Sequence, residues 1–312
     1  MKALIIGAAG FVGKYLIDHL RDDRGWSVSA SKLPFEQLDA RDTDIFDLDI
    51  LDREAVTALL HKVQPDYIFH LAAQSSVALS WKQPGLTVDV NIKGTVNILE
   101  AIRVLDKKPR ILLIGSGEEY GHILPEDIPV SEETPLRPGN IYAVTKACQG
   151  MLGKIYADAY NLDIVSVRAF NHIGPGQASS FVVSDFCRQV AEIEAGKQEP
   201  VIRVGNLSAQ RDFTDVRDVV RAYGLLIEHG LSGEVYNVGS GKAVKIKDIL
   251  DMILEQSSAD ISTEIDKSKF RPVDITVIQV DTKKIKERTG WIAQIDIRQT
   301  SAETLDFWRK NI

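Results

Sequence analysis

The fold is decided by the stretch Lys2-Ala3-Leu4-Ile5-Ile6-Gly7-Ala8-Ala9-Gly10-Phe11-Val12-Gly13. Its first residues predict a short strand, and a helical pattern follows the last glycine to about Leu20. Between a strand and a helix, such glycines permit a tight turn, let the backbone approach a pyrophosphate, and aim a helix N-terminus at it. The spacing is G-x-x-G-x-x-G rather than G-x-G-x-x-G, so the argument depends on the flanking strand and helix. We predict a dinucleotide on Gly7, Gly10, Phe11, Val12 and Gly13; a plain strand-to-helix turn is the alternative.

The end of the second predicted strand, near residues 27–30, indicates which dinucleotide binds. A chain that binds NAD normally carries an acidic residue there, which holds the ribose 2′-hydroxyl. This chain has Ser31 and Lys32 instead. A hydroxyl and a cation suit a 2′-phosphate, so we predict NADPH, with NADH possible. Lys32 as a solvated loop lysine is the alternative.

Strands and helices alternate through the first half of the chain. Strands are expected near residues 2–6, 27–30, 47–50, 67–71, 110–114 and 163–168, and helices near 11–20, 53–63, 84–105 and 140–160. This alternation predicts an α/β fold of the Rossmann type, with a doubly wound parallel sheet. After residue 170 the pattern changes to helices near 181–196, 215–229 and 245–257 between short extended pieces. We therefore expect an NAD(P)-binding domain at 1–170, to which some later segments return, and a smaller α/β substrate-binding domain, mainly 171–312.

Composition excludes several classes of function. The chain of 312 residues has a formal net charge of −7, which argues against binding to nucleic acid or to an acidic membrane surface. Its two cysteines, Cys148 and Cys187, lie in no metal-binding pattern. The first residues run directly into a strand and the apolar runs are short, so we expect no signal peptide and no membrane span. These features predict a cytoplasmic protein without a metal ion.

Tyr142 and Lys146 are the candidate catalytic pair. They lie in Asn140-Ile141-Tyr142-Ala143-Val144-Thr145-Lys146, where Asn140 is a suitable N-cap and an amphipathic run follows to about Tyr160. Four residues apart on a helix, the two side chains share one face. A nearby ammonium favours tyrosinate, so we expect Lys146 to lower the Tyr142 pKa toward neutrality and so favour proton donation to a carbonyl oxygen. A half-buried Tyr and an exposed Lys without chemistry are the alternative.

Two arginines indicate an anionic substrate. Arg211 lies in Gln210-Arg211-Asp212-Phe213, and Arg271 precedes Pro272. Arginine makes bidentate contacts to phosphate, and two arginines in loops of a cap domain predict a diphosphate clamp on an otherwise acidic protein. Surface salt bridges are the alternative for each of them.

The assembled set resembles the extended short-chain dehydrogenase/reductase family over the whole chain. The glycine trio, Ser116, Tyr142 and Lys146 have the order, spacing and secondary-structure context of that family. Within it, the chain looks most like enzymes that act on nucleotide-diphosphate sugars. The stretches that carry this likeness are His70-Leu71-Ala72-Ala73, Gly117-Glu118-Glu119-Tyr120-Gly121, Phe170-Asn171-His172-Ile173-Gly174-Pro175-Gly176-Gln177, Val204-Gly205-Asn206-Leu207 and Arg211-Asp212-Phe213-Thr214-Asp215-Val216-Arg217-Asp218.

The resemblance implies an NAD(P)H-dependent oxidoreductase that reduces the C4 keto group of GDP-4-keto-6-deoxy-D-mannose to GDP-D-rhamnose. It assigns catalysis to Ser116, Tyr142 and Lys146. Besides the glycine turn, Ser31 and Lys32, the cofactor contacts it implies are Asp49, Ile50, Leu71, Ala72, Ala73, Asn91, Tyr142 and Lys146. The implied substrate contacts are Glu118, Asn171, Phe181, Val182, Arg211 and Arg271.

Other readings remain open at this point. The dehydratases of this family use two residues after the Ser/Thr, typically Asp-Glu or Ser-Glu; here Gly117 and Glu118 follow, so the acid of the Asp-Glu type is absent while a base is not excluded. GDP-mannose 4,6-dehydratase, a 4-epimerase and a 4-ketoreductase forming GDP-6-deoxy-D-talose stay as alternatives, and a non-catalytic NADP-binding protein is a rival of another class. Family resemblance also suggests a homodimer, through the helices that contain Asn91 and Tyr156.

Overall fold

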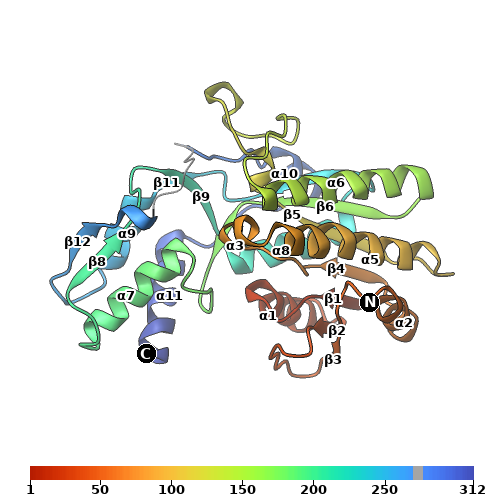
Figure 1. Cartoon of the computed structure of the whole chain (residues 1–312), viewed down its shortest axis with the longest axis horizontal. Helices are drawn as coiled ribbons and strands as arrows, with labels where there is room; N and C mark the ends of the chain where they lie inside the picture. The colour runs from red at the N-terminus through yellow and green to blue at the C-terminus, as the bar shows by residue number, and fades with distance from the viewer. Residues whose placement is uncertain (270–276) are drawn as a thin grey trace.

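The computed structural model describes residues 1–269 and 277–312, and its larger part is a sheet of seven strands covered by helices on both faces (Figure 1). In spatial order the strands are β10 (Val235–Val238), β6 (Ile164–Ala169), β5 (Arg110–Ser116), β4 (Tyr67–His70), β1 (Lys2–Ile6), β2 (Ser27–Lys32) and β3 (Asp44–Asp47). All neighbouring pairs are parallel. The chain order reverses between β1 and β4, which is where ligands bind in such sheets. The predicted doubly wound Rossmann sheet is confirmed.

The two faces of this sheet carry separate apolar cores. One core joins the sheet to α1 (Phe11–Asp18) and α8 (Val216–His229), and the other joins it to α2 (Arg53–Val63) and α5 (Gly94–Arg103). Residues of β1 are buried on both sides, as expected of a central parallel strand whose sequence is a continuous apolar run. Short elements complete this part: η1 (His19–Asp23), α3 (Val77–Lys82), η3 (Gly117–Tyr120), η4 (Pro125–Asp127) and α10 (Lys283–Thr289).

The expected helix at 84–105 forms, but its middle is π-helical and not α-helical. It is divided into α4 (Pro84–Val88), a π-helical stretch η2 (Asp89–Lys93) and α5. Beside it lies α6 (Ile141–Tyr160), which starts as predicted, with the Asn140 side chain accepting a hydrogen bond from the backbone N–H of Ala143 at 2.8 Å.

A second lobe follows residue 170 and lies at the left of Figure 1, around the C-terminus. Its apolar core is shared by α7 (Val182–Glu194), α9 (Ile246–Leu254) and α11 (Ile297–Asn311). The strands here form a parallel pair, β8 (Val201–Val204) with β12 (Ser262–Ile265), and a three-stranded sheet of β7 (Asn171–Ile173), β9 (Gln210–Asp215) and β11 (Ala243–Lys245); η5 (Lys267–Lys269) follows β12. After this lobe begins, α8, β10 and α10 pack against or join the large sheet again.

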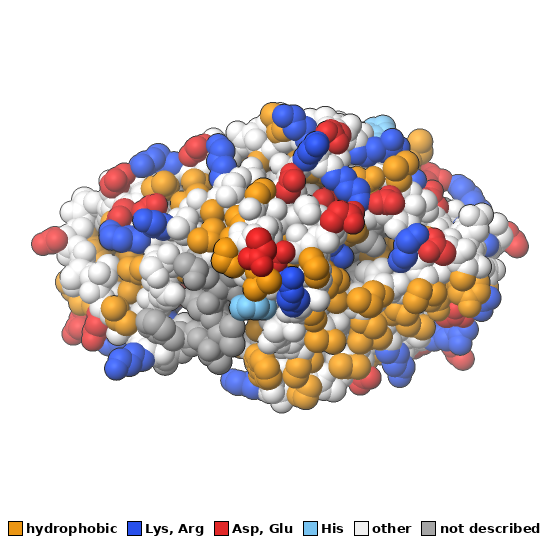
Figure 2. All heavy atoms as spheres, turned by 90° about the horizontal axis from the view of Figure 1, so that it is seen from above, with side chains coloured by type: hydrophobic (Ala, Val, Ile, Leu, Met, Phe, Trp, Pro, Cys, Tyr) orange, Lys and Arg blue, Asp and Glu red, His pale blue; other side chains and the backbone are white. Residues whose placement is uncertain are grey.

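One side of the molecule keeps an apolar surface. Along α6, exposed or partly exposed apolar side chains recur at Val144, Cys148, Met151, Ile155 and Ala159, which are three or four residues apart and therefore form one stripe. Figure 2 shows apolar side chains gathered along the lower right of the view, the side on which α6 lies. Within the described ranges, each helix is too short or too polar to cross a bilayer.

Candidate active site

The three glycines of the turn between β1 and α1 have different structural roles. Gly7 has a φ of +84°, and a side chain there would meet Ala72 at 2.5 Å. A Cβ on Gly13 would lie 2.0 Å from the carbonyl oxygen of Ala8, so Gly13 is required for close packing of α1 on the turn. Gly10 differs: a Cβ there would meet nothing within 4 Å. Open space in front of the N-terminus of α1 is what a pyrophosphate needs.

Ser31 and Lys32 lie at the end of β2, next to this turn. The Ser31 carbonyl oxygen accepts hydrogen bonds from the backbone N–H groups of Gly7 and Ala8, and its hydroxyl is buried. The Lys32 ammonium donates to the Asp47 carboxylate at 2.6 Å. A 2′-phosphate would therefore have to share Lys32 with Asp47 or take the place of Asp47. This exchange costs little free energy, because an ion pair near the surface is weak. The 2′-phosphate role of both residues stays a prediction.

The loop after β4 lies against the same turn. The backbone N–H groups of Leu71 and Ala72 donate to the carbonyl oxygen of Ile6 at 2.9 and 2.8 Å, and Ala73 follows. Asp49 and Ile50 follow β3, which lies on the opposite side of β1 from β4. Asp49 is exposed, and Ile50 is buried against Gly94. The predicted cofactor residues after β1, β2, β3 and β4 thus gather at one edge of the sheet.

Asn91 is placed to support this loop through its side chain. Its amide oxygen accepts from the backbone N–H of Gln74 at 2.8 Å, and its amide nitrogen donates to the carbonyl oxygen of Gln74 and to the Thr145 hydroxyl. These bonds tie the loop after β4 to α6. Both N–H groups and one lone pair of the amide are engaged within the described residues, so the structure favours a supporting role, and direct cofactor contact stays a prediction.

Ser116 and Tyr142 bring two hydroxyl groups together at the carboxyl end of β5. Ser116 is the last residue of the strand, and Tyr142, which is 9% exposed, lies in the first turn of α6. The two side chains hydrogen-bond, which lowers the Tyr142 pKa, but burial acts more strongly and the pKa is raised above its ordinary value. The expected lowering by Lys146 is therefore wrong for this structure, because desolvation of the phenol dominates. Tyr142 is a protonated phenol at neutral pH, the form that a proton donor needs.

Lys146 points from the same face of α6 into the sheet edge. Its ammonium donates to the carbonyl oxygen of Ile114 at 2.7 Å and to the Gln149 side chain at 2.9 Å. Burial lowers the Lys146 pKa to about 8, and the carboxylate of Glu119 opposes this shift. An ammonium has three N–H groups, so one remains after these two bonds within the described structure.

An ion pair that sequence reasoning missed lies beneath Ser116. Glu119 is buried and contacts the Arg168 guanidinium at 3.0 Å, and its other oxygen accepts from the backbone N–H of Ser116 at 2.7 Å. Arg168 also donates to the Tyr120 hydroxyl at 2.9 Å. The signal was Arg168 itself: a charged residue inside the apolar strand β6 requires a buried partner. This pair fixes the end of β5 that carries the Ser116 hydroxyl.

The predicted substrate residues fall into two groups. The Glu118 carboxylate accepts a hydrogen bond from the Asn140 side chain at 3.1 Å, so Glu118 lies between the carboxyl end of β5 and the start of α6. In the second lobe, Asn171 and Arg211 lie on the adjacent strands β7 and β9, and Phe181 and Val182 are exposed at the start of α7. Arg271 lies outside the described residues.

His172 connects the second lobe with the glycine turn. Its ring stacks on the Phe11 ring, with centroids 6.1 Å apart, and its Nδ1 contacts the carbonyl oxygen of Phe170. Burial lowers the His172 pKa. A buried neutral ring in this position favours packing over acid–base chemistry.

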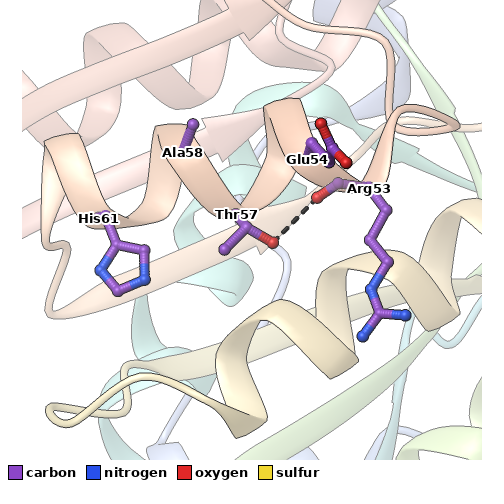
Figure 3. Close-up of a pocket in the computed structure, with 5 residues that line it drawn as sticks. All are labelled: Arg53, Glu54, Thr57, Ala58 and His61. Carbon is purple, nitrogen blue, oxygen red and sulfur yellow. Dashed lines mark hydrogen bonds between the residues drawn. The ribbon is translucent and has the colours of Figure 1, made fainter.

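A shallow groove of 510 Å³ lies elsewhere, along α2 (Figure 3). Its lining comes from one face of that helix, and Figure 3 shows the Thr57 hydroxyl turned back to the carbonyl oxygen of Arg53, at 2.9 Å. It contains none of the predicted site residues. Among the described residues, no group of three or more His, Cys, Asp or Glu side chains is placed to hold a metal ion.

The sequence profile of the family described as GDP-mannose 4,6 dehydratase matches residues 4–304. The chain belongs to this family. The GDP-mannose dehydratase family contains enzymes of the extended short-chain dehydrogenase/reductase type, so the expected resemblance, in its nucleotide-sugar branch, is confirmed.

Two curated relatives and one solved structure are similar to this chain over nearly its whole length. The chain is 30% identical, over 100% of its length and 98% of the relative, to GDP-6-deoxy-D-mannose reductase of Pseudomonas aeruginosa. It is 27% identical to GDP-mannose 4,6-dehydratase of Yersinia enterocolitica, over 97% and 92% of the two chains. The solved structure of RMD from Pseudomonas aeruginosa complexed with NADPH superimposes with a TM-score of 0.90 at 30% identity, over 100% of both chains.

Proposed function

We propose that this protein reduces the C4 keto group of GDP-4-keto-6-deoxy-D-mannose with NADPH and forms GDP-D-rhamnose. The observation that carries the proposal is the meeting of Ser116, Tyr142 and Lys146 at the sheet edge where the open Gly10 lies. The similarity to a GDP-6-deoxy-D-mannose reductase, and to a structure that contains NADPH, supports it. NADH stays possible, since the Lys32–Asp47 ion pair does not by itself require a 2′-phosphate.

The residues present fit the cofactor and the reaction. The turn at Gly10 leaves room for the pyrophosphate, and the third N–H of Lys146 is available for a ribose hydroxyl. When bound, NADPH supplies the hydride for C4. Ser116 and Tyr142 donate hydrogen bonds to the C4 oxygen, and the Tyr142 proton passes to this oxygen as negative charge develops there. The Glu119–Arg168 pair holds the Ser116 backbone during this step.

For the substrate, we propose that Arg211 holds the diphosphate and that Asn171, Phe181 and Val182 line the sugar nucleotide. These residues lie in the second lobe, on β7, on β9 and at the start of α7. His172 on β7 contacts Phe11 at the start of α1, so β7 lies beside the glycine turn. A sugar bound along β7 would therefore lie next to the proposed cofactor. The proposed role of Arg271 rests on the sequence alone.

Dehydration is the second candidate, because Glu118 occupies the position of a possible base and a 4,6-dehydratase is among the relatives.

The decisive experiment incubates purified protein with GDP-4-keto-6-deoxy-D-mannose and NADPH or NADH, and follows absorbance at 340 nm. Stoichiometric loss of absorbance supports reduction, and NMR of the product distinguishes D-rhamnose from 6-deoxy-D-talose. Conversion of GDP-mannose to the keto sugar without net cofactor consumption would replace the proposal by dehydration. Binding of NADPH without turnover of any sugar nucleotide would favour a non-catalytic protein.

We also propose a homodimer formed through the apolar stripe on α6. Met151 and Ile155 are 57% and 56% exposed, and helix α4 beside α6 exposes Leu86 and Val88. A continuous apolar surface of this kind on a chain of net charge −7 marks a contact with another protein surface. A second copy offers the same surface, which is how closed dimers form. A cytoplasmic location stays a prediction from the sequence.

The dimer is tested with Ile155→Asp, and Ile292→Asp is the matched control, since Ile292 is similarly exposed (49%) in the loop between α10 and α11. Light scattering coupled to size exclusion should show a dimer for the wild type and the control, and a monomer for Ile155→Asp. A wild-type monomer, or a dimer that tolerates Ile155→Asp, would contradict this interface.

A further inference from the structure

Lys146 is held on its inner side by a residue that the catalytic pattern does not include. Gln149 lies one turn further along α6, is 1% exposed, and accepts a hydrogen bond from the Lys146 ammonium at 2.9 Å. An ammonium only donates, so the amide oxygen must be the atom that faces Lys146. The amide nitrogen therefore points away from the ammonium.

That nitrogen, Nε2 of Gln149, is buried and has no hydrogen-bond partner within the described residues. Gln149 also lines a cavity of 290 Å³, which lies among α6, β5, β6 and the start of β10. The cavity wall includes buried Glu119 with its partner Arg168, and the side chains of Lys154 and Lys284. A buried amide N–H costs free energy unless it is hydrogen-bonded, and this cavity has polar side chains in its wall and is large enough for water.

We propose that Gln149 is a positioning residue: its amide oxygen keeps Lys146 charged and directed at the dinucleotide, while its amide nitrogen is solvated from the cavity behind α6. The inference rests on the proposed dinucleotide site. It adds to that site a residue that contacts Lys146 and lines the cavity among α6, β5 and β6.

The surroundings of Lys146 make this role necessary. Glu119 in η3 stabilises the positive charge of Lys146, but its two carboxylate oxygens are bonded to Arg168 and to the backbone N–H of Ser116. On β4, His70 is buried, and its pKa is lowered to about 3 by burial and by Lys146, so the ring is neutral and offers no counter-charge. On α6 itself, Tyr142 is a neutral phenol. Among these groups, Gln149 supplies a direct side-chain acceptor to the ammonium.

Two substitutions at Gln149 should act in opposite directions. In Gln149→Glu, a carboxylate replaces the amide oxygen and favours the ammonium, so the Lys146 pKa rises. In Gln149→Leu, the acceptor is lost from a buried cation, so the pKa falls below the present value of about 8. Each change is expected to move the pKa by about one unit, as for a hydrogen bond to a charged group.

The experiment measures the affinity for NADPH by fluorescence titration between about pH 6.5 and 10. If the charged Lys146 binds the ribose, wild-type affinity should weaken above about pH 8, up to tenfold per pH unit. The midpoint of this loss should lie about one unit higher in Gln149→Glu and about one unit lower in Gln149→Leu. Lys146→Met, as the control, should bind weakly and without this pH dependence.

Equal midpoints in wild type and Gln149→Glu, or shifts of both variants in the same direction, would overturn the role of Gln149. Should Gln149→Leu fold poorly, the upward shift in Gln149→Glu decides the question alone. A wild-type protein that binds neither NADPH nor NADH would instead refute the proposed dinucleotide site.

Discussion

Replacement of Tyr142 by Phe removes one oxygen atom from the site and should remove most of its catalytic power. The phenol is 9% exposed, so water has little access to replace the lost hydroxyl. Ser116 would remain as a donor to the C4 oxygen, without the proton that we propose Tyr142 delivers. General acid catalysis by a positioned side chain contributes roughly 10²–10⁴-fold, equivalent to about 3–5 kcal/mol of barrier. We expect kcat to fall by this factor.

The structure also predicts what the substitution leaves intact. Lys146 is bonded to Ile114 and Gln149 and not to the phenol, so the affinity for NADPH should change little. Because burial raises the Tyr142 pKa, the phenol stays protonated from about pH 6 to 8, and the loss in kcat should be the same across this range. Above about pH 8, the wild-type rate should decline as Lys146 loses its charge.

The assay combines kcat from absorbance at 340 nm with NADPH titration for each protein. Tyr156→Phe is the matched control: the same change on the same helix, at a hydroxyl that donates to Glu100 at 2.9 Å on the side of α5. The control should turn over as the wild type does. Turnover of Tyr142→Phe within about threefold of the wild type would refute the proton-donor assignment, and a parallel loss of NADPH binding would refute the separation of the two roles.

Five further substitutions test the supports of the site. Gly13→Ala places a methyl group 2.0 Å from the Ala8 carbonyl oxygen and should lower the free energy of unfolding by about 1–3 kcal/mol or more in denaturant titration, whereas Gly10→Ala should fold normally and weaken NADPH binding. Glu119→Ala leaves Arg168 buried without its carboxylate and should cost about 3–5 kcal/mol, with a smaller cost for Glu119→Gln; equal stability of all three proteins would contradict the importance of this pair. Arg211→Ala should raise the KM for the GDP-sugar more than it lowers kcat, and an unchanged KM would remove Arg211 from the phosphate contact.

Local sequence was sufficient wherever a short pattern fixes the backbone. The apolar run before Gly7 and the glycine spacing predict a strand, a tight turn and a helix, because each depends on residues close together in the chain. The predicted start of α6 at Asn140 is confirmed for the same reason. The alternation of strands and helices then determined the parallel sheet, since parallel strands need a crossover connection.

Tertiary structure decided the electrostatics. The sequence places Lys146 one turn from Tyr142, and this spacing suggested a lowered Tyr142 pKa. In the fold, burial raises the Tyr142 pKa more strongly than the hydrogen bond with Ser116 lowers it, and the Lys146 ammonium is turned to Ile114 and Gln149. Desolvation depends on every element packed around a group, which a four-residue spacing cannot report.

The sequence by itself determined the Rossmann sheet, the dinucleotide turn and the residue types that meet at the end of β5, because these follow from local pattern and strand order. Only the folded chain paired Glu119 with Arg168, 49 residues apart, and set the cavity behind Gln149. It also decided which later segment joins the large sheet as a strand, namely β10. Such contacts join segments distant in the chain, and their energies come from burial and from the satisfaction of buried charge, which exist only once the segments are packed together.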